Sequence, residues 1–222
     1  MRVIAEAEFI AAHAPMPLGA GDVHLWFFPA AATRAEIDHA RQLRELLAAY
    51  LHCDAMSLRI ERNAHGKPFL VETRGAVLQF NLAHSADALI VALAREQALG
   101  IDIETLQRPR PWLELAQRFF TQAEYAVLSA LPPAHLGAAF IELWSCKEAV
   151  LKALGRGIAF GLERLDFALD GAGRVGGLHA IAAEAGAAAD WQLLQLEPAP
   201  GLCGALAWRG APMRVCSFRA GT

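Results

Sequence analysis

The order of the secondary-structure patterns constrains the fold most, because the chain passes through one series of elements and then begins a similar series again. The first series opens with "DVHLWFF" at 22–28, which predicts a strand. Apolar residues at helical spacing then predict a helix over 33–51, with Thr33 and Glu36 forming a capping box at its start. The series ends with a turn at 65–70 and strands at 76–85 and 88–94.

The second series begins near Gln97 with a strand and a Pro-rich loop. Amphipathic helices are predicted over 112–131 and 134–155, separated by Pro132 and Pro133. Four short strands follow, at 162–169, 190–196, 202–208 and 213–218. Helices and strands mixed in each half predict an α+β fold of two similar lobes, 1–97 and 98–222, each a small antiparallel sheet with packed helices.

Composition excludes several classes of protein. The chain has 222 residues with 55% hydrophobic content, enough for a packed core. It has no apolar run long enough to span a membrane, and Glu6 and Glu8 interrupt a signal peptide, so we expect a cytoplasmic protein. The net charge of −3 and scattered arginines argue against nucleic acid or an anionic membrane as a partner. Four widely spaced cysteines indicate reduced thiols and no structural zinc.

The strand "GIDIE" alternates strictly between apolar and acidic residues. Ile101 and Ile103 are predicted on one face, and Asp102 and Glu104 on the other, because side chains alternate along a strand. The two carboxylates are then about 7 Å apart. That spacing suits two oxygen ligands of one Mg²⁺ ion, and the alternative is a solvated acidic edge strand.

The helix in "WSCKEAVLKALGRG" carries two of the three lysines in the chain. Glu148 and Lys152 are predicted to project together, which an ordinary i, i+4 surface pair would also explain. Lys147 falls within the apolar arc instead. A buried ammonium must find a partner, and we expect an anionic ligand at the boundary between the lobes to provide it.

Two further residues have both an ordinary and a functional interpretation. His84 ends the apolar strand "FNLAHS", where it is either a satisfied core or turn residue or a phosphate donor. Lys67 in "GKP" has the same two interpretations: it is either a solvated turn residue or a phosphate donor.

In this order, "GKPFL", "FNLAHS", "GIDIE" and "WSCKEAVLKALGRG" resemble the motifs of Sfp-type 4′-phosphopantetheinyl transferases. That family shares a GKP turn, an FN-x-S-H-S strand end, a G-[IV]-D-[IVL]-E strand and a W-[ST]-x-K-E-x-x-x-K helix. The resemblance extends over about 59–169, and "GRGIAFGLERLDFAL" after the helix is similar too. It implies a pseudo-twofold α+β fold of two lobes with the active site in the cleft between them.

The resemblance also implies roles for individual residues. Asp102, Glu104 and Glu148 would form the magnesium site. Lys152 and His84 would contact the pyrophosphate of coenzyme A, with Lys67 near its 3′-phosphate. Ser85, Lys147 and Arg34 would be further coenzyme-binding residues. This sequence departs from the family at Ala83, which stands where Ser is common and lacks its hydroxyl donor, and in a shorter basic segment between Pro29 and Arg44.

The implied reaction transfers 4′-phosphopantetheine from coenzyme A to a serine of an apo acyl or peptidyl carrier protein, with Mg²⁺, releasing adenosine 3′,5′-bisphosphate. Glu148 would bind the metal, take the serine proton directly, or act through a water. We expect a monomer that receives its carrier near Arg118, Phe119 and Phe120. Two alternatives remain: a metal-dependent pyrophosphohydrolase of coenzyme A or nucleotides, and a non-catalytic module that binds coenzyme A or carrier proteins.

Overall fold

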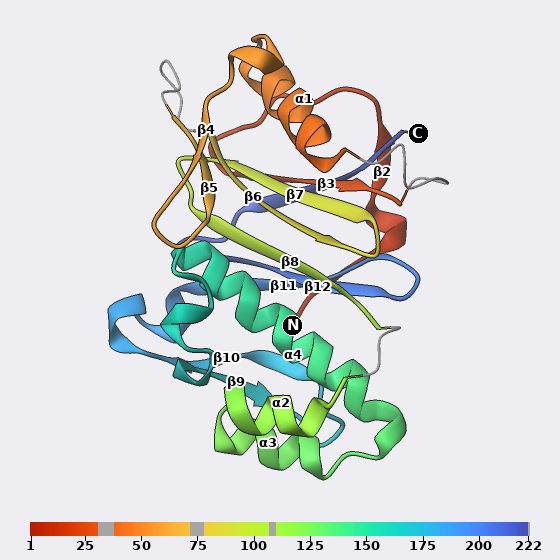
Figure 1. Cartoon of the computed structure of the whole chain (residues 1–222), viewed down its shortest axis with the longest axis vertical. Helices are drawn as coiled ribbons and strands as arrows, with labels where there is room; N and C mark the ends of the chain where they lie inside the picture. The colour runs from red at the N-terminus through yellow and green to blue at the C-terminus, as the bar shows by residue number, and fades with distance from the viewer. Residues whose placement is uncertain (31–37, 72–77, 107–109, 222) are drawn as a thin grey trace.

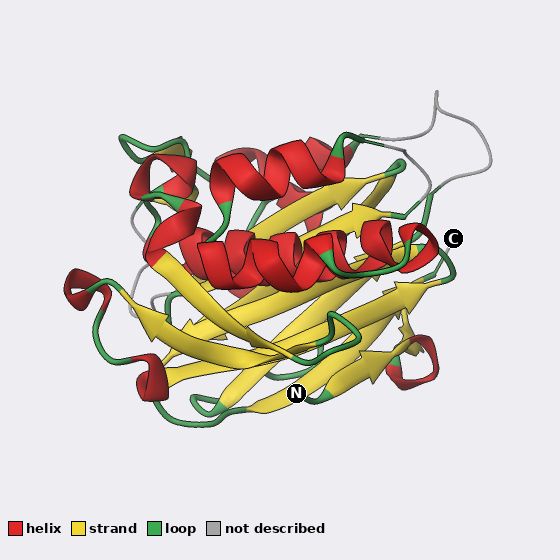
Figure 2. Ribbon diagram, turned by 90° about the horizontal axis from the view of Figure 1, so that it is seen from below, coloured by secondary structure: helices red, strands yellow, loops and turns green. Residues whose placement is uncertain are grey.

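The computed structural model describes residues 1–30, 38–71, 78–106 and 110–221 and has the expected α+β architecture. Two sheets pack face to face, with helix α1 on the outer face of one and the long helix α4 on the outer face of the other (Figure 1). Seen from below, helices lie in front of the strands (Figure 2).

The first half contains the predicted strands. These are β3 (Asp22–Phe28), β6 (Leu78–Ser85) and β7 (Ala88–Arg95). A two-residue turn joins β6 to β7, and both of its residues, Ala86 and Asp87, have positive φ, as a tight hairpin turn requires. The short strands β4 (Ile60–Arg62) and β5 (Pro68–Leu70) form a separate hairpin around the GKP turn.

Helix α1 (His39–Leu51) is shorter than the sequence predicts. The backbone amide of Arg41 donates to the Asp38 side chain, so Asp38 is the N-cap and the helix begins at His39. The expected start, with Thr33 and Glu36, lies outside the described residues.

The single helix predicted over 112–131 is wrong, because the chain forms two helices there. They are α2 (Trp112–Phe119) and α3 (Gln122–Ser129). Phe120 between them is extended, and Thr121 caps α3 in a capping box with Glu124. The ring of Phe120 turns into the core, where it stacks on Phe140 with centroids 4.9 Å apart. The local capping signal therefore overrides the continuous apolar pattern.

The remaining helix and strands agree with the predictions. Helix α4 (Pro133–Leu154) has Pro at its first turn and ends at Gly155 in the left-handed conformation. The strands are β8 (Leu99–Thr105), β9 (Leu165–Leu169), β11 (Trp191–Ala199), β12 (Leu202–Arg209) and β13 (Arg214–Ala220). Strand β10 (Val175–Ile181), which pairs with β9, was not predicted because two glycines interrupt its pattern.

The two sheets repeat one connection order. In the first, β3 pairs with the second strand of the β6–β7 hairpin; in the second, β8 pairs with the second strand of the β11–β12 hairpin. All of these pairs are antiparallel. A helix lies between the first strand and the hairpin in each case, α1 or α4. This repetition accounts for two similar halves.

The chain ends add parallel strands to the sheets and cross between them. Strand β1 (Val3–Ala5) pairs with β11 in the second sheet, while β13 pairs with β3 and β2 (Ile10–Ala12) in the first. Each sheet therefore contains a strand from the other half of the chain. The division into lobes at 97/98 remains a proposal, and these exchanges would tie the two parts together.

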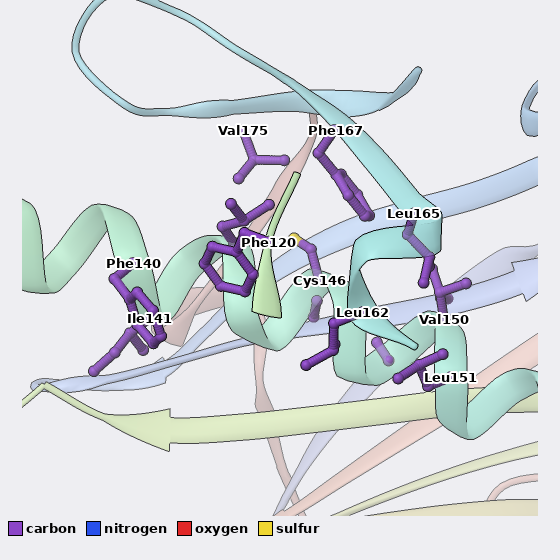
Figure 3. Packing of buried hydrophobic residues seen from close by; sticks show 14 of the residues in the cluster. Phe120, Phe140, Ile141, Cys146, Val150, Leu151, Leu162, Leu165, Phe167 and Val175 are labelled. Atoms are coloured by element: carbon purple, nitrogen blue, oxygen red, sulfur yellow. The ribbon is translucent and has the colours of Figure 1, made fainter. Parts of the chain in front are cut away.

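Three apolar clusters hold the layers. One lies between the sheets and includes Ile101 and Ile103, one lies under α1, and one surrounds α4 together with α2, α3, β9 and β10. Figure 3 shows the third, with Phe120, Phe140 and Cys146 among its side chains. The Ile face of β8 thus points toward the first sheet and its acidic face toward α4, as the alternation predicts.

None of the helices in the described ranges combines the length and apolar character needed to span a lipid bilayer.

Candidate active site

A pocket of about 440 Å³ lies where the two halves meet. The β4–β5 turn, the end of β6, the acidic face of β8 and the C-terminal part of α4 form its walls. Of the predicted site residues, it brings together Lys67, His84, Asp102, Glu104, Glu148 and Lys152. Residues that are up to 85 positions apart in the chain therefore face one space.

Asp102 lies on β8 with its side chain against α4. One carboxylate oxygen, Oδ1, accepts a hydrogen bond of 2.7 Å from the Lys152 ammonium. The other, Oδ2, is buried without a hydrogen-bond partner in the described part of the chain. Burial raises the pKa of Asp102, and the nearby Lys152 ammonium and Ser145 hydroxyl oppose that rise. Oδ1 of this carboxylate thus has a hydrogen-bond donor, and Oδ2 can accept from or coordinate another group.

Glu148 lies one turn before Lys152 on the same side of α4. Its side chain is buried, and its Oε1 likewise has no hydrogen-bond partner among the described residues. Burial and the neighbouring Asp102 raise the pKa of Glu148 to about 7, and Lys152 counteracts them in part. Two carboxylates close enough to repel each other form a site that a cation or a proton stabilises.

Glu104 is the outermost carboxylate of the pocket. Its Oε2 lies 3.4 Å from the Arg110 guanidinium, and its side chain is 21% exposed. It lies on the same face of β8 as Asp102, as the alternation predicts.

Lys152 and His84 are two of the basic residues that line the pocket. Lys152 is 27% exposed and also donates to the Ile101 carbonyl at 3.1 Å. His84 is exposed at the end of β6, where its ring stacks on that of His39 with centroids 5.6 Å apart. Both side chains are accessible to a ligand entering from solvent.

Lys67 lines the pocket but already has two protein partners. Its ammonium donates to the carbonyls of Leu99 (2.9 Å) and Lys152 (2.7 Å). Burial lowers the pKa of Lys67 to about 8. Asn63 in the same turn donates to the Gly155 carbonyl at 2.9 Å, so this turn holds the C-terminal end of α4. An ammonium has three N–H donors, and one of them remains for a ligand.

Lys147 does not reach the pocket, and the expectation of an anionic ligand for it is wrong. Its side chain is completely buried on the opposite side of α4, and its ammonium forms a 2.7 Å ion pair with Glu124 of α3. It also donates to the carbonyls of Leu162 and Leu165. The partner that the sequence required is therefore a carboxylate of the protein itself.

The other predicted residues lie outside the pocket or outside the described chain. Ser85 ends β6 and is not part of the described pocket lining. Arg34 falls within 31–37, outside the described residues. Ala83 lines the pocket, but it is only 5% exposed and packs between the sheets.

Three polar side chains in the described lining of the pocket were not predicted as site residues. Asn81 is buried on β6, where its Oδ1 accepts a 2.8 Å hydrogen bond from the Ile101 amide and joins the edges of the two sheets. A polar residue on the buried side of an apolar strand was the signal for it. Arg62 and His65, from the β4–β5 hairpin, add basic character. Arg62 ends β4 and His65 lies in the turn after it, and neither belongs to a motif that assigned it a role.

The expected carrier surface is only partly available. Phe120 is buried in the core, whereas Phe119 is half-buried and Arg118 is exposed with its guanidinium 5.0 Å from the Phe119 ring centroid. Phe120 therefore cannot contact a partner.

Within the described residues, no three His, Cys, Asp or Glu side chains are clustered as a complete metal site. The residues of the pocket nevertheless fit a hard cation. Asp102 and Glu148 each have a buried carboxylate oxygen without a partner. Mg²⁺ is commonly held by one or two carboxylates, with waters and substrate phosphates completing its coordination.

The fold and pocket thus define an α+β protein of two repeated halves with an acidic and a basic wall facing each other at their junction. A family model described as the 4′-phosphopantetheinyl transferase superfamily matches residues 98–198. The chain is 36% identical over 170 residues to 4′-phosphopantetheinyl transferase HetI of Nostoc, which covers 76% of this chain and 68% of that protein.

Two other relatives are similar over shorter stretches. A phosphopantetheinyl transferase of Thraustochytrium is 34% identical over 62% of this chain and 54% of its own length. 4′-Phosphopantetheinyl transferase Sfp of Bacillus subtilis is 32% identical over 60% of this chain and 57% of its own length. The chain therefore belongs to the 4′-phosphopantetheinyl transferase superfamily and is a transferase of that type.

Proposed function

We propose that this chain transfers 4′-phosphopantetheine from coenzyme A to a serine of an apo acyl or peptidyl carrier protein, using Mg²⁺. The observation that carries the proposal is a single pocket in which two buried carboxylates, Asp102 and Glu148, face Lys152 and His84. A diphosphate needs cationic contacts, and a divalent ion needs oxygen ligands. The pocket offers both, from both halves of the chain.

Coenzyme A would bind with its pyrophosphate between Lys152 and His84. Lys152 pairs with Asp102, and its exposure allows the ammonium to donate to a phosphate oxygen instead. Lys67, with one donor remaining, would lie near the 3′-phosphate, and Ser85 and Arg34 would be outer contacts. Lys147 has no place in this assignment because Glu124 already neutralises it.

Asp102, Glu148 and Glu104 would hold the magnesium ion. When bound, such an ion offsets negative charge on the phosphate oxygens. Asp102 and Glu148 repel each other as carboxylates, and a cation held between them would offset that repulsion. Arg110 would release Glu104 when that carboxylate becomes a ligand.

In the transfer, the carrier serine oxygen forms a bond to the phosphorus that bears the pantetheine arm. The bond from that phosphorus to the bridging oxygen breaks, and adenosine 3′,5′-bisphosphate leaves with the bridging oxygen. Glu148 would accept the serine proton on a carboxylate oxygen as the general base, since its side chain lines the pocket beside Asp102 and Lys152. Lys152 would stay with the phosphate oxygens throughout.

The test is to incubate the full chain with coenzyme A, Mg²⁺ and a panel of apo-carriers, and to weigh the products by intact-protein mass spectrometry. We expect one carrier to gain a single phosphopantetheine group. Asp102→Asn should abolish the gain, whereas Asp190→Asn, at an exposed carboxylate paired with Arg209, should not alter it. Cleavage of coenzyme A without a carrier, or tight coenzyme binding without turnover, would contradict the proposal.

We also propose that the chain acts in the cytoplasm and as a monomer, since both walls of the pocket come from one chain. Size-exclusion chromatography with light scattering of the active protein tests the second point, and a dimer would contradict it.

A further inference from the structure

Three buried side-chain oxygens or nitrogens in the described residues have no hydrogen-bond partner: Asp102 Oδ2, Glu148 Oε1 and Ser145 Oγ. The first two belong to the proposed metal site. Ser145 does not line the pocket and has no role in the assignment above. A buried polar group without a partner costs about 1–3 kcal/mol, so a completely buried hydroxyl here needs an explanation.

The packing of β8 on α4 places Ser145 next to Asp102. A Cβ atom on Gly100 would lie 2.0 Å from the Ala149 carbonyl oxygen, so β8 touches the helix backbone at that point. Asp102 is on the same face of the strand as Gly100, about 7 Å further along. Ser145 is four residues before Ala149, about 6 Å back along the helix. If strand and helix run in opposite directions, the step from Gly100 to Asp102 on β8 lies beside the step from Ala149 to Ser145 on α4. The hydrogen bond from Lys152 to the Ile101 carbonyl indicates that direction.

Electrostatics agree with this placement. The Ser145 hydroxyl is among the groups that counteract the rise in the pKa of Asp102, so it acts on the carboxylate form. Ser145, Glu148 and Lys152 also share one side of α4, at spacings of three and four residues. Ser145 therefore lies beneath the floor of the pocket, behind the carboxylate that faces it.

We propose that Ser145 is a positioning residue: its hydroxyl donates to the Asp102 carboxylate and holds that side chain in orientation for the divalent cation. This rests on the proposed function. When Lys152 turns to the phosphates, Asp102 loses the ammonium donor at its Oδ1. Ser145 then remains as a side-chain donor to this carboxylate, beside the backbone amide of Ile103.

Packing alone would not require a hydroxyl at this position. Cys146, the next residue, is equally buried, and it packs in the apolar cluster around α4. The two neighbours make a matched pair of small side chains, one beneath the pocket and one in the core. Truncating each to alanine separates positioning from packing.

The experiment is a titration of the full chain with Mn²⁺, as a paramagnetic probe for the cation, in the presence of coenzyme A. Free Mn²⁺ is measured by electron paramagnetic resonance for the wild type, Ser145→Ala, Ser145→Thr and Cys146→Ala. Loss of a group that orients a metal ligand weakens metal binding about 10–100-fold. We expect about a tenfold weaker Kd in Ser145→Ala, near-complete rescue in Ser145→Thr, which keeps the hydroxyl, and a wild-type Kd in Cys146→Ala.

The outcomes are distinguishable. An unchanged Mn²⁺ Kd in a folded Ser145→Ala would overturn the positioning role and leave the proposed function intact. Equal weakening in Ser145→Ala and Cys146→Ala would overturn it as well, since packing would then explain the effect. Absence of Mn²⁺ binding by the wild type would instead overturn the proposed metal site. If the threonine methyl prevents folding, Ser145→Cys replaces it and should give a Kd between those of the wild type and Ser145→Ala, because a thiol is a weak donor.

Discussion

Lys147 and Lys152 lie five residues apart on α4, yet they belong to two different environments. Lys147 is completely buried between α4 and α3, where Glu124 and two backbone carbonyls take up its charge. Lys152 is 27% exposed in the pocket, where Asp102 is its partner and a ligand can compete for it. Five residues turn a helix by about 140°, which sends the two ammonium groups to opposite sides.

The difference shows how a charge is used for structure on one side of a helix and for chemistry on the other. Around Lys147, the ammonium has the Glu124 carboxylate and two backbone carbonyls as acceptors, and Glu124 also accepts from the Phe167 amide at 2.8 Å. Around Lys152, two buried carboxylate oxygens have no hydrogen-bond partner among the residues that the structure describes. The paired groups around Lys147 stabilise the fold, whereas the carboxylate oxygens around Lys152 can still bind a ligand.

The largest effect is expected on the structural side, in Lys147→Met. Breaking a buried ion pair leaves an uncompensated charge and typically costs about 3–5 kcal/mol. We therefore expect the free energy of unfolding, measured by urea denaturation, to fall by that amount. Transfer activity per folded molecule should stay close to the wild-type value, because Lys147 does not line the pocket.

The matched control is the double variant Lys147→Met/Glu124→Gln. Glutamine removes the stranded charge while its carbonyl can still accept from the Phe167 amide, so the double variant should be more stable than Lys147→Met alone. A single variant that keeps wild-type stability and loses transfer would reverse the comparison and make Lys147 a functional residue.

The next effect is expected on the pocket side, in Lys152→Met. Removing one group that stabilises developing charge costs about 10²–10³ in rate. We expect that loss in kcat/KM for coenzyme A, with a smaller loss of stability than in Lys147→Met, since water can reach Asp102 from the pocket. Lys152→Arg should recover only part of the rate, because a guanidinium does not reproduce the point charge of an ammonium. Wild-type rates in Lys152→Met would contradict the assignment.

A smaller effect is expected where β8 contacts α4, in Gly100→Ala. The added methyl would meet backbone atoms of Ala149 and Ala153 at 2.0 and 2.3 Å, so the strand must move away. Overpacking of this kind costs about 1–3 kcal/mol, and the displaced Asp102 should also lower the transfer rate. Gly171→Ala is the control, since nothing lies within 4 Å of the added methyl there. Equal free energies of unfolding for the two variants in urea would show that β8 can accommodate the added methyl group.

The sequence predicted the α+β class, the face of β8 that carries Asp102 and Glu104, and the grouping of Glu148 with Lys152, because periodicity determines which side chains share a face. It did not identify the partner of Lys147. Glu124 is 23 residues away on a helix that the sequence joined to its neighbour, and only the break at Phe120 turns Glu124 toward α4.

The sequence also did not predict that strands from the two chain ends pair in the sheet of the other half. Strands β1 and β2 have three residues each, too few for alternation to show, and their pairing partners lie near the other end of the chain. The resemblance supplied the residues of the pocket, but not the hydrogen bonds by which Lys67 and Asn81 assemble it. Such bonds depend on packing between elements far apart in the sequence.

The smallest effect tests a buried group that has no closed ionic network, His24 beneath α1. Trp26 donates to the Tyr50 hydroxyl at 2.8 Å, which leaves that hydroxyl to donate to Nδ1 of a neutral His24 at 2.7 Å. Burial lowers the pKa of His24, and Arg214 adds to this while Asp22 opposes it. Below the unfolded-state pKa of about 6.5, the unfolded chain therefore binds a proton that the folded chain resists, and stability falls with decreasing pH. The slope cannot exceed about 1.4 kcal/mol per pH unit for one proton.

Urea denaturation between pH 7.5 and 5.5 should show a shallower pH dependence in His24→Gln than in the wild type, and identical slopes would mean that His24 accepts its proton inside the fold.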